Sequence, residues 1–281
     1  MQQFLKSVNY KKLIVWGIVV VLLYTSYGWL GDIIVSIFGV LDLQFHIINE
    51  ALLPSLSAFM DTIMSLALSI IYLILAIFIV KKKPGTLKIS PPLAVVFCVI
   101  MGFGFNGITG LWFNFVDNVL VKIPAVAENV NYFSGVYDDL ESGAYIWSLL
   151  SISIIGPISE EILFRLLIFH SLERIYSKPW FPIIVSGVLF GIWHMIFVQS
   201  VYTAVMGCLF GFIYYKTRNI FITMLIHMVN NFIGNLPPAL NTDAVYNILA
   251  MVANIMVLPT IVILILMHTN KSGNALEAWE E

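Results

Sequence analysis

The chain has 281 residues, of which 60% are hydrophobic and 11% are charged, and its formal net charge is −2. Because about a quarter of the residues in soluble domains are charged, this composition excludes an ordinary soluble domain and indicates a membrane protein. The near-neutral charge and the lack of a recognisable motif exclude nucleic acid as a partner. Cys98 and Cys208 lie far apart inside apolar runs, which indicates buried thiols rather than a disulfide or a metal pair.

Eight apolar segments are predicted to cross a membrane, because a spanning helix needs about 20 apolar residues. The first is interpreted as a retained span and not a signal peptide, since the apolar run continues past Leu30 without a small-x-small cleavage pattern. The sixth is short, and only Gln199 and Ser200 separate it from the fifth, which predicts a tight helical hairpin. The predicted spans are 13–38, 54–80, 92–116, 144–170, 181–199, 201–215, 219–236 and 245–268.

The loops between these spans alternate in charge. Basic residues precede the first span and follow the second, fourth, sixth and eighth, whereas the other loops hold Lys122 as their only basic residue. Because cytoplasmic loops are enriched in Lys and Arg, we expect both termini in the cytoplasm. Residues 1–281 are thus predicted to form one polytopic all-α domain, a bundle of about eight transmembrane helices. The connection 117–143 is predicted to be an external loop and 270–281 a flexible cytoplasmic tail.

The fourth predicted span carries ionisable residues in the middle of an apolar run. Glu160, Glu161 and Arg165 lie between the apolar stretches 152–158 and 166–169. An ionised group at bilayer depth costs about 3 kcal/mol or more, so such groups usually face a polar interior and carry function. Glu161 and Arg165 stand four residues apart in the order that favours an ion pair. Glu160 points about 100° away from Glu161 and is left to a different neighbour.

Two further predicted spans carry polar side chains at helical spacing. On the fifth, Phe190 and His194 lie one turn apart. On the seventh, His227 and Asn231 are four residues apart on one face, with Asn230 beside them. Imidazole, amide and carboxylate groups on three different spans can meet only in the interior of the bundle.

The chemistry available to such a cluster is hydrolytic. A desolvated carboxylate can act as a general base, and a neighbouring imidazole can share a water molecule with it. A second imidazole and an amide donor can stabilise an oxyanion. This full set is supplied by Glu160, His194, His227 and Asn231. The same set without Asn231 could also hold a divalent metal, because Glu and His are competent ligands.

Each of these residues also has a simpler interpretation. Glu160 could lie at a helix end and reach the headgroups, although the apolar run continues beyond it. His194 on its own would be an interior histidine held by a hydrogen bond. His227 and Asn231 could serve only to bridge neighbouring helices. The presence of all three groups together favours a functional site.

The three clusters resemble a known signature. Glu160-Glu161-x-x-x-Arg165, Phe190-x-x-x-His194 and His227-x-x-x-Asn231 are similar to the three motifs of the CPBP family, the CAAX-processing and bacteriocin-processing intramembrane proteases, also called the Abi family. All three motifs are complete and stand in the family's order. The resemblance covers about residues 144–236, which we expect to be the catalytic core. It implies an eight-helix bundle that cleaves peptide bonds within the membrane.

The resemblance also implies a role for each motif. Glu160 and His194 would activate a water molecule, and His227 and Asn231 would polarise the scissile carbonyl. The supporting residues are Glu161 and Arg165, which would hold their helix in register, together with Phe190 and Asn230. The family is often called a metalloprotease, while its structural work favours a glutamate-activated water without metal. The sequence agrees with either, and a divalent ion such as zinc would be held by Glu160, His194 and His227.

Other functions use the same kinds of residue. A proton-coupled transporter also needs intramembrane Glu and His, although the sequence shows no inverted repeat. A non-catalytic membrane scaffold or immunity protein, binding a peptide or a signalling kinase, is a third function class. The expected partners are the lipid bilayer and a peptide or membrane-associated protein substrate, with the oligomeric state left open. The short loops look bacterial, so we expect a bacterial cell membrane protein. In bacteria the resemblance implies the maturation or clearance of small peptides, such as a bacteriocin or quorum-sensing precursor.

Overall fold

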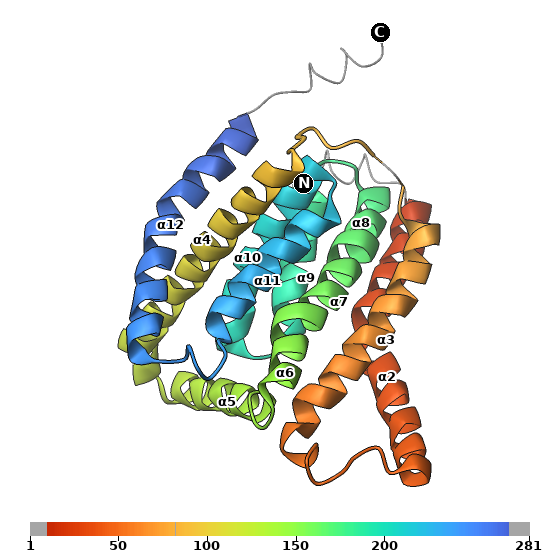
Figure 1. Ribbon diagram of the computed structural model, residues 1–281. Helices are drawn as coiled ribbons and strands as arrows, with labels where there is room; N and C mark the ends of the chain where they lie inside the picture. The colour runs from red at the N-terminus through yellow and green to blue at the C-terminus, as the bar shows by residue number, and fades with distance from the viewer. Residues whose placement is uncertain (1–9, 82, 270–281) are drawn as a thin grey trace.

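The computed structural model describes residues 10–81 and 83–269 of the chain. Every regular element in these two ranges is a helix, which confirms the predicted all-α class (Figure 1). The predicted tail 270–281 lies outside the described residues, as do Lys6 and Lys271, which contributed to the predicted orientation.

Five of the described helices are long and apolar enough to cross a membrane, so the protein is a multi-pass membrane protein. They are α2 (Tyr10–Phe45), α3 (Leu56–Ile79), α4 (Pro91–Asn118), α10 (Phe197–Thr217) and α12 (Asp243–Thr269), with the short turn η1 (Leu53–Ser55) leading into α3. Two shorter apolar helices, α9 (Trp180–Trp193) and α11 (Ile220–Gly234), lie among them. All of these helices fall on predicted spans.

The fourth predicted span is a helical stretch from Tyr145 to Ile175 with two wide turns in it. Its parts are α6 (Tyr145–Ser148), the π-helical η3 (Leu149–Ile155), α7 (Gly156–Glu161), the π-helical η4 (Ile162–Ile168) and α8 (Phe169–Ile175). A π-helix bonds residue i to i+5 and often occurs at functional sites. The Glu160-Glu161 pair therefore ends a short α-helical piece held between two π-helical ones.

The predicted break between the fifth and sixth spans is misplaced. The structure ends α9 at Trp193 and begins α10 at Phe197, so Gln199 lies inside α10. The turn is made by Met195, whose φ of 61° is left-handed, and by the extended Ile196. The chain stays apolar through this turn, so hydropathy gave no sign of it. As a result, His194 caps the end of α9 rather than lying within a span.

The connection 117–143 is also more ordered than predicted. It contains the turn η2 (Leu120–Lys122) and the helix α5 (Pro124–Leu140), which lies crosswise at one end of the bundle (Figure 1). Its apolar side chains, which include Val126, Val130 and Phe133, pack against Val116 and Val198. The polar residues that suggested a loop are mostly on the exposed face of an amphipathic helix.

The opposite end of the bundle is basic. Lys81, Lys83 and Arg174 line one cavity there, and Arg218 bonds Glu173 at 2.6 Å. The predicted orientation would place this end in the cytoplasm and α5 outside.

Candidate active site

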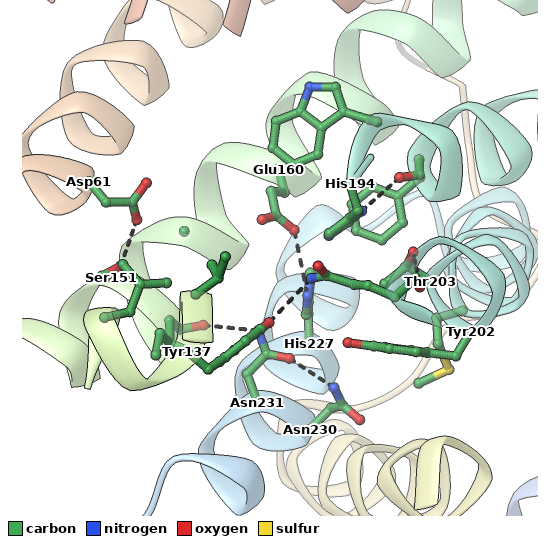
Figure 2. Close-up of a pocket in the computed structure, with 18 of the residues that line it drawn as sticks. Asp61, Tyr137, Ser151, Glu160, His194, Tyr202, Thr203, His227, Asn230 and Asn231 are labelled. Atoms are coloured by element: carbon green, nitrogen blue, oxygen red, sulfur yellow. Dashed lines mark hydrogen bonds and ion pairs between the residues drawn. The ribbon is translucent and has the colours of Figure 1, made fainter. Parts of the chain in front are cut away.

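The structure brings the motif residues to one place. Six of the eight candidate residues line a cavity of about 210 Å³ inside the bundle (Figure 2). They come from α7, from the end of α9 and from α11, and they are Glu160, Phe190, His194, His227, Asn230 and Asn231. Glu161 and Arg165 are fully buried on the same helical stretch as Glu160. The arrangement excludes a headgroup-facing position for Glu160, because its side chain is only 18% exposed.

The backbone just before Glu160 is adapted to the wide turn. The amide of Gly156 donates to the carbonyl of Ser151, five residues back. A Cβ on Gly156 would lie 2.3 Å from that oxygen, so only glycine fits this turn without displacement. Pro157 follows and has no amide hydrogen to give to a helix. This local sequence therefore favours the π-helical turn, and Glu160 follows it on α7.

Glu161 and Arg165 form the predicted ion pair. Arg165 Nε lies 3.1 Å from Glu161 Oε2, and both side chains are fully buried. The guanidinium carbon lies 5.3 Å from the ring centre of Phe190 and 5.6 Å from that of Phe210. Arg165 Nη1 and Nη2 have no hydrogen-bond partner among the described residues. The ion pair and the two aromatic faces hold this buried charge in place.

His227 lies between the two glutamates. Its Nδ1 is 3.2 Å from Glu161 Oε1, and its Nε2 is 3.7 Å from Glu160 Oε2. The imidazole also stacks on Phe210 with ring centres 5.0 Å apart. Because an ionised carboxylate only accepts hydrogen bonds, Nδ1 carries the hydrogen towards Glu161. Glu161 thus orients His227 in addition to pairing with Arg165, a contact that the sequence did not predict.

His194 is oriented by the backbone of its own motif. Its Nδ1 lies 2.8 Å from the carbonyl oxygen of Phe190. A carbonyl can only accept, so Nδ1 carries the hydrogen and a neutral ring has its lone pair on Nε2. The rings of Phe190 and Trp193 also contact the imidazole, with ring centres 4.8 and 5.2 Å from its own. The motif therefore presents His194 Nε2 as a base.

The two asparagines of α11 form a short chain of hydrogen bonds. Asn231 Nδ2 donates to the carbonyl of Ile152 at 2.9 Å, and Asn231 Oδ1 accepts from Asn230 Nδ2 at 2.8 Å. An amide nitrogen has two hydrogens, so Asn231 keeps one further donor. Asn230 Oδ1 is buried and has no partner among the residues that the structure describes. One donor and one acceptor thus remain for a ligand in the cavity.

Several residues that line this cavity were missed in the sequence. Asp61 comes from α3 and Tyr27 from α2, outside the three motifs. Tyr137 comes from α5; burial raises the pKa of its phenol to about 12, and it accepts a hydrogen bond of 3.2 Å from Gln199. Asp61 could have been found, because it is an acidic residue inside the predicted span 54–80. Tyr27 and Tyr137 gave no signal that distinguishes them from interfacial tyrosines.

The donor groups do not gather as a metal centre would require. Within residues 10–81 and 83–269, no three side chains of His, Cys, Asp or Glu lie close enough together to hold a metal ion. Glu160 Oε2 and His227 Nε2 lie 3.7 Å apart, and in that part of the chain no third donor of these types completes a site with them. We therefore derive no step through a metal.

The sequence comparisons agree with this site. Residues 142–233 match a family model described as type II CAAX prenyl endopeptidase Rce1-like, and this range contains all eight candidate residues. This match supports the resemblance of residues 142–233 to the CPBP family. The same resemblance fits the order of the three motifs, each of which supplies a side chain to one cavity.

A curated relative is known from a bacterium. The chain is 39% identical over 81 residues to a protein of Bacillus subtilis (strain 168) named "Putative membrane peptidase YdiL". The match covers 28% of this chain, and it spans about a third (32%) of the length of that relative. No solved structure gives a significant match to the chain.

Proposed function

We propose that this protein is an intramembrane endopeptidase that hydrolyses a peptide bond of a membrane-associated protein or a small peptide precursor. One observation carries the proposal: Glu160 and His194 come from different helices and face the same cavity inside an apolar bundle. The family match, which includes both residues, supports the same reaction class.

In the proposed reaction, Glu160 and His194 Nε2 hold the attacking water. Glu160 takes one proton from the water, and the oxygen forms a bond to the scissile carbonyl carbon. The carbonyl oxygen becomes an oxyanion. When the C–N bond breaks, Glu160 returns the proton to the leaving nitrogen, which leaves as an amine beside a new carboxyl group.

The proposed oxyanion donors are His227 and the second amide hydrogen of Asn231. Since Nδ1 of His227 is directed at Glu161, Nε2 can donate only when the ring is an imidazolium. Glu161 would face that positive charge across 3.2 Å and also pairs with Arg165 at 3.1 Å. The oxyanion would thus face a cation in a water-poor cavity, where electrostatic stabilisation is strong.

The test is to compare released peptides from membranes that contain each variant. Mass spectrometry should find products with wild type and none with Glu160→Ala or His194→Ala, provided that each variant is folded in detergent. His268→Ala is the matched control, because His268 is exposed near the end of α12. Products that persist in folded Glu160→Ala protein would remove the proposal.

The other function classes give different outcomes. A transporter would show solute or proton flux in liposomes that is lost in Glu160→Gln. A scaffold or immunity protein would keep its cellular phenotype in Glu160→Ala and His194→Ala.

A further inference from the structure

Asp61 is the second acidic side chain that faces the cavity. Its Oδ2 accepts a hydrogen bond of 2.6 Å from the Ser151 hydroxyl, and its Oδ1 accepts one of 3.3 Å from the Tyr27 hydroxyl. Both donors are neutral. In the described part of the chain, no Lys, Arg or His forms an ion pair with Asp61.

Three other carboxylates inside the bundle, those of Glu160, Glu161 and Glu173, each have a basic partner. Glu161 pairs with Arg165 at 3.1 Å, and Glu173 pairs with Arg218 at 2.6 Å. Glu160 has His227 at 3.7 Å. A carboxylate at bilayer depth is costly without a counter-charge, and such residues mark the path or site of a ligand. The counter-charge for Asp61 can come from a ligand in the cavity that it lines (Figure 2).

Two aromatic side chains lie beside Asp61. Tyr27, which bonds Asp61, and Trp193 both line the cavity, and their ring centres are 4.6 Å apart. Electron-rich ring faces attract ammonium and guanidinium groups, most strongly where water is excluded. A carboxylate with adjacent Tyr and Trp rings is a suitable environment for a cationic side chain.

The neighbouring cavity has the same charge preference. A second cavity of about 630 Å³ shares Tyr137, Tyr202 and Asn231 with the first and extends between α4, α5 and α12. Its charged lining residues are Asp117, Asp138 and Glu141. No Lys or Arg of the described residues lines either cavity. Clustered charges of one sign raise the local concentration of ligands of the opposite sign, so cationic peptides are favoured on this side.

We propose that Asp61 is a specificity-determining residue, the acidic subsite for a Lys or Arg side chain next to the scissile bond of the substrate. The substrate class is therefore a cationic peptide. This inference rests on the proposed peptidase function. In the complex, the ammonium or guanidinium group bonds the Asp61 carboxylate, while Ser151 and Tyr27 hold that carboxylate in place.

A role for Asp61 in positioning alone makes a different prediction. Asp61 bonds Ser151 on the π-helical turn before Glu160, so it could act only by fixing that turn. Its loss would then slow the cleavage of all peptides by the same factor. Loss of a cationic subsite instead removes the difference between charged and neutral peptides.

The test uses pairs of peptides that differ at one position. A cleaved sequence is first found by mass spectrometry of a mixed peptide library with purified wild-type protein. Its basic residue is then replaced by norleucine, which keeps most of the length and removes the charge. We expect wild type to prefer the Lys peptide by about tenfold or more in kcat/KM, since loss of a close buried charge pair has at least that effect.

The variants assign the preference to Asp61. In Asp61→Asn the ratio of kcat/KM for the Lys and norleucine peptides should fall to about one. Asp32→Asn is the matched control and should keep the wild-type ratio, because Asp32 is exposed on α2 and lines neither cavity. A wild type without preference for the Lys peptide overturns the inference. An Asp61→Asn protein that cleaves the Lys and norleucine peptides more slowly by the same factor also overturns the inference.

Binding separates this inference from the proposed function. In a Glu160→Gln background, fluorescence polarisation should show tighter binding of the Lys peptide, and addition of Asp61→Asn should abolish the difference. If wild type cleaves both peptides equally, the peptidase function stands and the subsite is wrong. If wild type cleaves no peptide of the library, a Lys peptide that binds the protein is selected from the same library. Loss of its preference over the norleucine peptide in Asp61→Asn would then show that the peptidase function is wrong and the subsite stands.

Discussion

His227 Nδ1 lies 3.2 Å from Glu161 Oε1, although the two residues are 66 positions apart. The second oxygen of the same carboxylate bonds Arg165 at 3.1 Å. Glu161 is therefore shared between a structural cation and an imidazole that faces the cavity. This arrangement links the stability of the helix bundle to the orientation of the proposed oxyanion donor.

Removal of the Glu161 charge should affect both stability and activity. Glu161→Gln leaves Arg165 buried without a counter-charge, which should destabilise the protein by about 3–5 kcal/mol. The double variant Glu161→Gln/Arg165→Met should regain much of the thermal stability in detergent, because it buries no unpaired charge. Its activity should stay low, since His227 still lacks its anionic acceptor. A double variant with wild-type activity would show that Glu161 does not act through His227.

The wide turn before Glu160 should require glycine. Gly156→Ala places a methyl group 2.3 Å from the carbonyl oxygen of Ser151, and such overpacking costs about 1–3 kcal/mol. Because the turn leads into α7, the position of Glu160 should change and the rate of cleavage should fall. Gly135→Ala on α5 is the control, since nothing lies within 4 Å of its Cβ position. Equal melting temperatures and rates for the two variants would contradict this account of the turn.

The packing of α9 on α10 should depend on which glycine is replaced. A Cβ on Gly187 would lie 2.4 Å from the backbone nitrogen of Cys208, whereas one on Gly211 would stay 3.3 Å from its nearest neighbour. Gly187→Ala should therefore push the helices apart and lower the melting temperature, because the obstacle is backbone. Gly211→Ala should remain close to wild type. A lower melting temperature for Gly211→Ala than for Gly187→Ala would contradict this packing of α9 on α10.

The two asparagines should differ in importance. Asn231→Ala removes a proposed oxyanion donor and leaves the Ile152 carbonyl without its bond, so the rate should fall about 10²–10³-fold. Asn230→Ala removes only the side chain that bonds Asn231, so it should lower the cleavage rate by a smaller factor. Single-turnover cleavage rates of one peptide by the two variants measure both losses. A larger loss for Asn230→Ala would indicate that its unpaired oxygen, rather than Asn231, contacts the substrate.

Part of this site could be predicted from the sequence because its motifs lie on single helices. The spacing of Glu161 and Arg165 fixes a shared helix face, and their ion pair is present. The predicted meeting of Glu160, His194 and His227 in the interior is also present. Both results follow from helical periodicity and from the cost of polar groups in lipid.

Other features could not be predicted, because they depend on contacts between distant segments. No periodicity joins His227 to Glu161 or brings Asp61 to Ser151. The turn at Met195 joins α9 to α10, which pack on each other, and the chain remains apolar through it. The helix α5 has an apolar stripe that is masked by its polar composition until its partners are known.

The most direct test of the account is the turnover of one peptide by purified, reconstituted wild-type and Glu160→Gln proteins. The substitution keeps the shape of the side chain and removes the base. The account predicts that the Glu160→Gln rate falls about 10²-fold or more while its melting temperature stays near that of wild type. A folded Glu160→Gln protein that cleaves at the wild-type rate would contradict the central claim.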